Sequence, residues 1–181
     1  ALMHAGAHHS AKIRILRVDT ELLDGKTPSE SVIILDGLEG AHGDFFGQVS
    51  GILIPGGFGS RGVEGMVMMA RLAREKAIPC FGICLGMQVM AIDCARHILG
   101  LASANSSEFD PETPHPVISL LEEQKKVMDM GGTMRLGSYD AVIVSGTKMA
   151  AAYGNVAVVS ERHRHRYEFT SHYRPQFEAA G

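Results

Sequence analysis

Cys84 stands between two glycines, each two positions away, in the stretch PCFGICLGMQ that covers residues 79–88. The apolar run 78–83 before it is typical of a strand, and the run 85–100 after it is typical of a helix that stops at a glycine. A sharp strand-to-helix turn would expose the sulfur at the carboxyl edge of a sheet, where open α/β folds bind ligands. We therefore interpret Cys84 as a candidate nucleophile on an elbow.

Three features of such a turn would activate a cysteine. The N-terminus of the following helix favours the thiolate over the thiol. The backbone N–H of Leu85, in the first helical turn, would be free to donate to an oxyanion. Gly82 and Gly86 would leave room for a crowded backbone. The alternative is that Cys84 is a small buried hydrophobe beside two packing glycines, and the pentapeptide by itself does not decide between the two.

A glycine loop, PGGFG at 55–59, also follows an apolar strand pattern, and it precedes the helical pattern 63–77. Because adjacent parallel strands end side by side, this loop would face Cys84, and the N–H of Gly57 would be a second oxyanion donor. The alternative is a loop that binds an anion or a nucleotide phosphate. However, GGFGSRG has neither the dinucleotide-binding nor the P-loop glycine spacing.

The order of these patterns predicts an α/β fold. Strand, glycine loop, helix, strand, sharp turn and helix follow one another, which is the rhythm of βαβ units on a parallel sheet. We expect a three-layer arrangement, with a mostly parallel central sheet and helices on both faces. Outside the βαβ region, we predict strands over 11–19, 31–35, 140–146 and 155–169, a loop over 104–116, a turn-flanked segment over 131–137, and a weak helix over 172–181.

Composition bounds the class of protein. The chain has 181 residues, of which 45% are hydrophobic and 20% are charged, and this suits one globular domain with a core. A net charge of −3 does not indicate a nucleic-acid partner, and the apolar runs are too short to cross a membrane. The three cysteines, Cys80, Cys84 and Cys94, have no disulfide-framework spacing, which favours a reducing, cytoplasmic location.

Five stretches carry a resemblance to a known family: GILIPGGFGSRGVEG, GICLGMQ, ANSSEFDP, GGTMRLG and ERHRHRYEF. GICLGMQ resembles the nucleophile motif of class I (triad) glutamine amidotransferases. GGTMRLG together with ERHRHRYE is more specific, and is similar to the C-terminal amidotransferase domain of the CTP synthase family. The five stretches occur in the family's order and span nearly the whole chain. The resemblance implies the flavodoxin-like fold of that class.

The resemblance implies a role for each matching residue. Cys84 would attack the side-chain amide of glutamine and form a glutamyl thioester, and the backbone N–H groups of Leu85 and Gly57 would form the oxyanion hole. Glu108 would bind the α-amino group of the substrate, and Arg166 would lie by its backbone end. The substrate-binding set that the resemblance implies is Gly57, Leu85, Gly86, Met87, Gln88, Glu108, Arg166 and Tyr167.

The resemblance also implies partners. The whole enzyme would be a ligase that sends ammonia from L-glutamine to a synthetase domain, where ATP-activated UTP is aminated to CTP. That domain is absent from this sequence. The resemblance implies no cofactor in the present domain, ATP and Mg²⁺ in the synthetase domain, and GTP as an activator. The expected partners are glutamine and the synthetase domain of the same full-length chain, which would form a homo-tetramer, with no nucleic acid and no membrane.

The sequence departs from the family pattern at the triad. The family completes it with the histidine and glutamate of an HPE motif after ERHRHRYE, and none of the nine histidines here is followed by Pro-Glu. We therefore expect residues 1–181 to be an amidotransferase domain without its C-terminal part, inactive alone. A shortened chain or an unrecorded tail explains this better than a decayed paralogue does. His163 and His165 are candidates for a substitute base, although a polar face towards a partner domain or solvent is favoured.

Two further functions stay open. A cysteine hydrolase with a flavodoxin-like fold would share the elbow, but it would not explain Glu108 and Arg166 as a clamp for an amino acid. A glutamine-binding or interaction domain that does not turn over would explain the missing base. His4, His8 and His9 have spacing that metal ligands use, but no cysteine or carboxylate lies near them in sequence, so we expect no metal.

Overall fold

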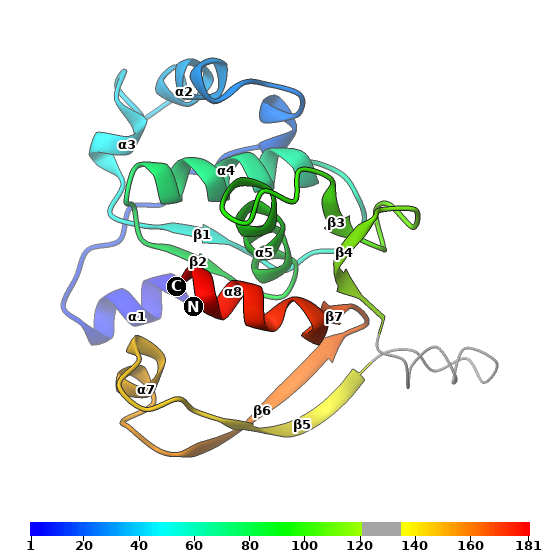
Figure 1. The fold of residues 1–181 in the computed structure, drawn as a ribbon. Coiled ribbons are helices and arrows are strands. Elements are labelled where there is room, and N and C mark those ends of the chain that lie inside the picture. The colour runs from blue at the N-terminus through cyan, green and yellow to red at the C-terminus, as the bar shows by residue number, and fades with distance from the viewer. Residues whose placement is uncertain (121–134) are drawn as a thin grey trace. The chain divides into compact units, whose positions relative to one another are not determined.

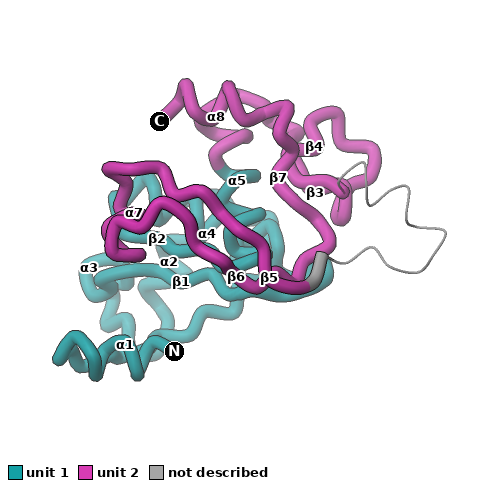
Figure 2. Tube along the Cα trace, turned by 90° about the horizontal axis from the view of Figure 1, so that it is seen from below, with its two compact units in different colours: residues 1–93 teal, residues 94–181 magenta. Residues whose placement is uncertain are grey.

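The computed structural model describes residues 1–120 and 135–181. The chain divides into two compact units, residues 1–93 (unit 1) and residues 94–181 (unit 2), which Figure 2 colours separately. Each unit is described by itself. The predicted segment 131–137, which carries GGTMRLG, falls largely outside the described residues.

Unit 1 contains the predicted strand–loop–helix–strand–elbow–helix sequence. Strands β1 and β2 pair in parallel, with Ile52 opposite Cys80 and Ile54 opposite Gly82, so both end at the same edge. The helical patterns predicted to follow them are confirmed (Figure 1). In chain order the elements are α1 Leu2–His8, η1 Thr20–Leu23, α2 Pro28–Asp36, α3 Phe45–Gln48, β1 Ile52–Ile54, α4 Val63–Glu75, β2 Cys80–Gly82 and α5 Leu85–His97, whose last turn belongs to unit 2.

Helix α4 organises the core of unit 1. Its buried residues recur at helical spacing, which gives it one apolar face. It contacts β2, η1 and α2, and Figure 1 shows it between the β1–β2 pair and α2. Packing of α4 against these neighbours holds in place the glycine loop that comes directly before it. The main core cluster is Leu23, Leu35, Ala41, Phe45, Met69 and Leu72.

The strand predicted over 31–35 is wrong, because these residues lie in helix α2. The helix begins with a capping box, in which Thr27 Oγ1 accepts from the Glu30 N–H at 3.3 Å and Glu30 Oε2 accepts from the Thr27 N–H at 2.8 Å. Pro28 at the first helical position adds a preset backbone angle. The start signal TPSE therefore outweighs the β-branched run that follows it.

The strand predicted over 11–19 is also wrong. These residues form no regular element, and no described strand pairs with them. Leu16 and Val18 pack against the unit 1 core, whereas Ile15 is 50% exposed. The alternation therefore predicted neither a backbone partner nor which apolar side chains turn inward.

Unit 2 is built largely from strands. Its elements are β3 Ala104–Ser106, β4 His115–Ser119, β5 Arg135–Val142, α7 Lys148–Ala152, β6 Val158–His165, β7 Glu168–Phe169, η3 Ser171–Tyr173 and α8 Arg174–Ala180. The predicted C-terminal helix is confirmed as α8. The single strand predicted over 155–169 is β6 followed by β7, and the predicted strand 140–146 overlaps only the end of β5. The loop predicted over 104–116 contains β3 and the first residues of β4.

The strand pairings are both parallel and antiparallel. Strands β1 and β2 are parallel, as expected for a βαβ unit, because α4 connects them. Strands β3 and β4 are also parallel, although no helix connects them, whereas β4–β7 and β5–β6 are antiparallel. Over the described residues these pairings fall into three sheets, of which β5–β6 is a long hairpin. Helices and strands alternate in unit 1, and the predicted α/β class is confirmed.

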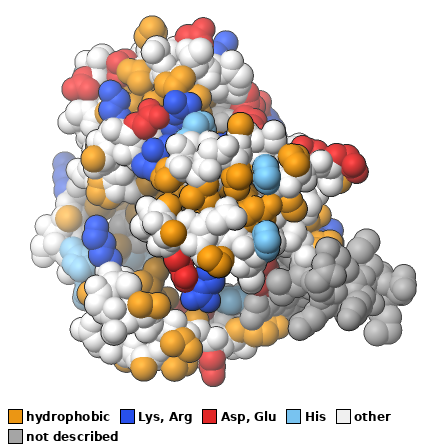
Figure 3. Space-filling model, in the orientation of Figure 1, with side chains coloured by type: hydrophobic (Ala, Val, Ile, Leu, Met, Phe, Trp, Pro, Cys, Tyr) orange, Lys and Arg blue, Asp and Glu red, His pale blue; other side chains and the backbone are white. Residues whose placement is uncertain are grey.

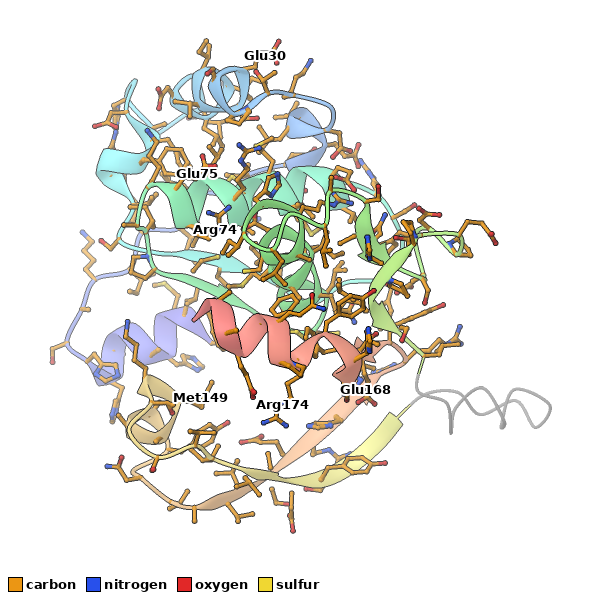
Figure 4. The ribbon with its side chains drawn as sticks, viewed as in Figure 1. Glu30, Arg74, Glu75, Met149, Glu168 and Arg174 are labelled. Atoms are coloured by element: carbon orange, nitrogen blue, oxygen red, sulfur yellow. The ribbon has the colours of Figure 1, made fainter. Side chains whose placement is uncertain are left out.

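A buried ion pair joins α4 to α5 in unit 1. Arg74, labelled on α4 in Figure 4, donates from Nε to Asp93 Oδ2 at 2.9 Å and from Nη2 to Oδ1 at 3.2 Å. The Asp93 side chain is 2% exposed, while that of Arg74 is 32% exposed. Removing the arginine would leave a buried carboxylate without its main cation.

We therefore expect Arg74→Met to lower the free energy of unfolding by about 2 kcal/mol, less than for a fully buried pair because Arg74 is partly solvated. Urea denaturation measures the loss. Arg71→Met is the matched control, because Arg71 Nε and Glu75 Oε1, 2.7 Å apart, form a more exposed pair within the same helix. Its loss should stay below about 1 kcal/mol. Equal losses from the two variants would contradict the structural role of the Arg74–Asp93 pair.

Candidate active site

Cys84 lies at the strand-to-helix turn that the sequence predicts. It stands between the end of β2 and the first residue of α5, and its φ is 54°, in the left-handed region that non-glycine residues rarely adopt. The Cys84 carbonyl accepts the N–H of Gln88 at 3.2 Å, and the Ile83 carbonyl accepts the N–H of Gly86 at 2.9 Å. These hydrogen bonds start α5 directly after the cysteine. The predicted unusual backbone conformation at Cys84 is confirmed.

The two flanking glycines are required by close backbone approaches. A Cβ on Gly82 would collide with the backbone of Gly86 and Met87, and a Cβ on Gly86 would collide with the carbonyl of Ile54 in β1. Both obstacles are main-chain atoms, which cannot rotate away as a side chain can. The spacing G-x-C-x-G is therefore a packing requirement of the elbow, as inferred from the sequence.

The glycine loop after β1 lies beside the elbow. A Cβ built on Gly56 would be 3.3 Å from the Cβ of Cys84, and one built on Gly57 would be 3.3 Å from Cδ2 of Leu85. Leu85 is the first residue of α5, and the N–H groups of a first helical turn have no acceptor within the helix. The predicted neighbourhood of loop and elbow is thus confirmed. The oxyanion-hole roles of Gly57 and Leu85 remain predictions.

The side chains in the first turn of α5 differ in how far they are buried. Leu85 and Gln88 are buried, with 4% and 5% exposure, whereas Met87 is 42% exposed. Gly86 packs on β1, as described above. The contacts with glutamine that the resemblance implies for these four residues remain predictions.

The three cysteines differ in chemistry, although all are half-buried. Cys80 lies in β2, Cys84 at the elbow and Cys94 in α5. Burial raises the pKa of the Cys80 thiol, and the negative charge of Asp93 raises it further. Cys80 is therefore a poorer thiolate than an ordinary cysteine.

Glu108 lies in a loop of unit 2 that Ser106 organises. The Glu108 N–H donates to Ser106 Oγ at 3.2 Å, and the Ser106 carbonyl accepts the N–H groups of Phe109 and Asp110, both at 3.0 Å. Ser106 is fully buried at the end of β3. Ser106 is not among the residues predicted from the sequence. A serine two positions before Glu108 could have indicated it, because serine side chains often accept a hydrogen bond from the backbone two residues later.

Glu108 and Arg166 interact electrostatically within unit 2, although they are far apart in sequence. Burial raises the pKa of the Glu108 carboxyl, and the positive charge of Arg166 partly opposes that rise. Arg166 follows the last residue of β6 and is exposed, and the half-buried Tyr167 comes next. A carboxylate and a guanidinium are complementary in charge to the two ends of a free amino acid.

Strand β6 has two chemically distinct faces, as predicted. His163 and His165 are partly buried, while Arg162, Arg164 and Arg166 are exposed. The His163 ring stacks on Tyr139 of β5, with centroids 5.3 Å apart, and lies 5.0 Å from the His165 ring. Whether either histidine acts as a base, and whether this face meets a partner, remain untested predictions.

Further features bound the chemistry of the described residues. Among residues 1–120 and 135–181, no group of three or more His, Cys, Asp or Glu side chains is arranged to hold a metal ion. Within the same ranges no helix has the length and apolar character needed to cross a bilayer. On the face drawn in Figure 3, acidic, basic and hydrophobic side chains are interspersed.

A family model identifies the class of protein. The chain matches the model described as "Glutamine amidotransferase class-I" over residues 1–181, and it belongs to that family. The elbow cysteine and the adjoining glycine loop lie within the matched residues.

Within this family the chain is similar to CTP synthases. It is 46% identical to the CTP synthase of Streptococcus sanguinis and 50% identical to that of Halalkalibacterium halodurans, in each case over all 181 residues and 31% of the relative's length. It spans less than a third of these relatives. A solved structure described as "Trypanosoma brucei CTPS - glutaminase domain with bound acivicin" matches with a TM-score of 0.84 and 37% identity, over 98% of this chain and 63% of that one.

Proposed function

We propose that this chain is the glutaminase part of a CTP synthase and that Cys84 is its nucleophile. The observation that carries the proposal is the elbow. Cys84 sits at a φ of 54° before α5, with the Gly56–Gly57 loop against it, in a chain that matches the amidotransferase family throughout. The similarity to a glutaminase domain described with bound acivicin supports it further.

The proposed reaction begins at the sulfur. The Cys84 thiolate attacks the side-chain carbonyl carbon of L-glutamine, and the N–H groups of Leu85 and Gly57 stabilise the resulting oxyanion. The tetrahedral intermediate collapses, the C–N bond breaks, and the nitrogen leaves as ammonia after gaining a proton. Water then attacks the glutamyl thioester, which releases glutamate and restores the thiol. A histidine and a glutamate of an HPE motif would move these protons, and residues 1–181 contain no such motif.

The charged end of the glutamine has its own proposed residues, which the family resemblance implies. In this proposal the Glu108 carboxylate binds the α-ammonium group, and Arg166 with the main chain of Tyr167 binds the α-carboxylate. Gly86, Met87 and Gln88 contact the rest of the substrate. The charges of Glu108 and Arg166 support this assignment, because a carboxylate and a guanidinium are complementary to the two charges of an amino acid.

For the whole enzyme, we propose that the ammonia aminates ATP-activated UTP to CTP in a synthetase domain, as the similarity to CTP synthases suggests. ATP and Mg²⁺ belong to that domain in this proposal, GTP acts as an activator, and the full-length chains form a tetramer in the cytoplasm. A second candidate function is glutamine binding without turnover. It is favoured by one observation, the lack of an HPE motif in residues 1–181.

Alkylation of the cysteines tests the site without requiring turnover. Iodoacetamide should modify Cys84 faster than Cys80, since a raised pKa leaves Cys80 with less thiolate. L-Glutamine should protect Cys84, and L-asparagine, one methylene shorter, should protect it much less. Mass spectrometry of peptides measures each site. Equal modification of all three cysteines, with no protection by glutamine, would contradict both the elbow and the substrate.

The clamp predicts a selective effect of Glu108→Ala. Losing one charge-assisted contact should raise the glutamine concentration that half-protects Cys84 by about tenfold or more, while alkylation without glutamine stays unchanged.

Because burial raises the pKa of Glu108, protection in the wild type should also weaken as the pH falls, from a higher pH than for an ordinary glutamate. The variant should lose this pH dependence. If the variant is alkylated more slowly even without glutamine, a folding defect explains it instead.

A further inference from the structure

Two side chains in unit 2, those of His165 and Glu168, flank the residues proposed to bind the substrate carboxylate, and we call this pair the bracket. Strand β6 ends at His165 and β7 begins at Glu168, so Arg166 and Tyr167 form a two-residue link between them. His165 Nδ1 lies 3.8 Å from Glu168 Oε1 across this link. Their side chains are 24% and 15% exposed, and Glu168 is labelled in Figure 4, where β7 begins.

The link joins two different sheets. Strand β6 pairs with β5 in the hairpin, where His163 lies opposite Gly137. Strand β7 pairs with β4, where Glu168 lies opposite Ser119, and β4 pairs in turn with β3. The loop after β3 carries Glu108. The relative position of Arg166 and Glu108 therefore depends on how the link is held.

Each end of the bracket is anchored. On the hairpin side, the His165 ring is 5.0 Å from that of His163, which stacks on Tyr139. On the β7 side, Thr170, two residues after Glu168, hydrogen-bonds through Oγ1 to the Pro116 carbonyl at 2.6 Å and to Ser119 Oγ at 2.9 Å. A ring nitrogen that carries a hydrogen is attracted to a carboxylate oxygen at the bracket distance. The bracket thus ties two fixed segments together around Arg166.

We propose that His165 and Glu168 are positioning residues, which hold the Arg166–Tyr167 link so that it is ready to bind the α-carboxylate of the substrate. This inference rests on the proposed function and adds a requirement to it. Arg166 is exposed and has a long side chain, so a free link would sample many arrangements. Holding its backbone at both ends reduces the entropy that substrate binding must overcome.

The test uses protection of Cys84 from iodoacetamide by L-glutamine, in a chain of residues 1–181. His165→Asn and Glu168→Gln should each raise the half-protecting glutamine concentration by about three- to tenfold. The double variant should raise it by no more than the larger single effect, because either substitution already opens the bracket. Alkylation without glutamine should be unchanged. His172→Asn is the matched control, since it is an exposed histidine of the same unit that belongs neither to the link nor to the side chains that anchor it.

The outcomes separate this inference from the function beneath it. Failure of glutamine to protect the wild-type chain would contradict the proposed function itself. Protection of the wild type and of both variants at the same glutamine concentration would overturn the bracket alone. Equal weakening in His172→Asn, or single effects that simply add in the double variant, would also overturn it. Thermal unfolding midpoints complete the test, because a loss of protection that follows a fall in Tm in all three variants indicates a structural role only.

Discussion

A polypeptide of residues 1–181 is expected to hydrolyse glutamine about 10²- to 10⁴-fold more slowly than the same residues extended by a C-terminal segment that carries the HPE motif. Without a general base, the Cys84 thiolate must arise from the helix terminus and local donors alone. The departing nitrogen must take its proton from water, and no group activates water to hydrolyse the thioester. Oxyanion stabilisation and substrate binding would remain, so the residual rate should still exceed the rate in solution.

The experiment compares ammonia release by the two polypeptides at saturating glutamine. The extension is taken from the CTP synthase of Streptococcus sanguinis, which is 46% identical over these residues. Cys84→Ala in the extended form is the control and should abolish turnover. If the short polypeptide turns over as fast as the extended one, the base lies within residues 1–181. Substitution of His163 and His165 would then be the next step.

The elbow could be predicted from sequence because its chemistry is local. Gly82 and Gly86 are required by contacts that form within a few residues of Cys84 and with the adjacent strand. Parallel pairing of β1 and β2 then brings the glycine loop to the same edge, which follows from the order of elements alone. The residues with the clearest roles at the elbow are therefore also those that short-range patterns identify.

Other features depended on contacts that no local pattern reports. The strand expected over 31–35 is a helix because the capping box of Thr27 and Glu30 decides the start of α2. The segment 11–19 has the alternation of a strand but no backbone partner among the described residues. In both cases hydrogen bonding, rather than the apolar pattern, decided the element.

The charged residues of unit 2 show the same limit at longer range. The interaction of Glu108 with Arg166 was predicted from the family resemblance, because nothing in spacing or composition links two residues so far apart. The ion pair of Arg74 with Asp93 and the bracket of His165 with Glu168 were not predicted at all. Their members look like ordinary surface residues in the sequence, and only the packing of helices and strands gives them partners.

Gly82→Ala should displace the backbone that positions Cys84. The new Cβ would meet the carbonyl oxygen of Gly86 and the backbone nitrogen of Met87, each 2.5 Å from its ideal position. Main-chain atoms in the first turn of α5 would have to move, and Leu85 and Gln88 would move with them. Overpacking of this kind typically costs about 1–3 kcal/mol of stability. A displacement of about 1 Å can cost about 100-fold in rate.

We therefore expect the glutaminase rate of the extended form to fall about 100-fold in Gly82→Ala, while the Tm falls only modestly. Gly37→Ala is the matched control. Gly37 has a φ of −77°, and the nearest atoms to an added Cβ are carbonyl oxygens at 3.5 Å, an ordinary contact distance. That variant should keep both its rate and its Tm. If Gly82→Ala kept full activity, the backbone approach at the elbow would not set the geometry of the nucleophile. The G-x-C-x-G spacing would then need another explanation.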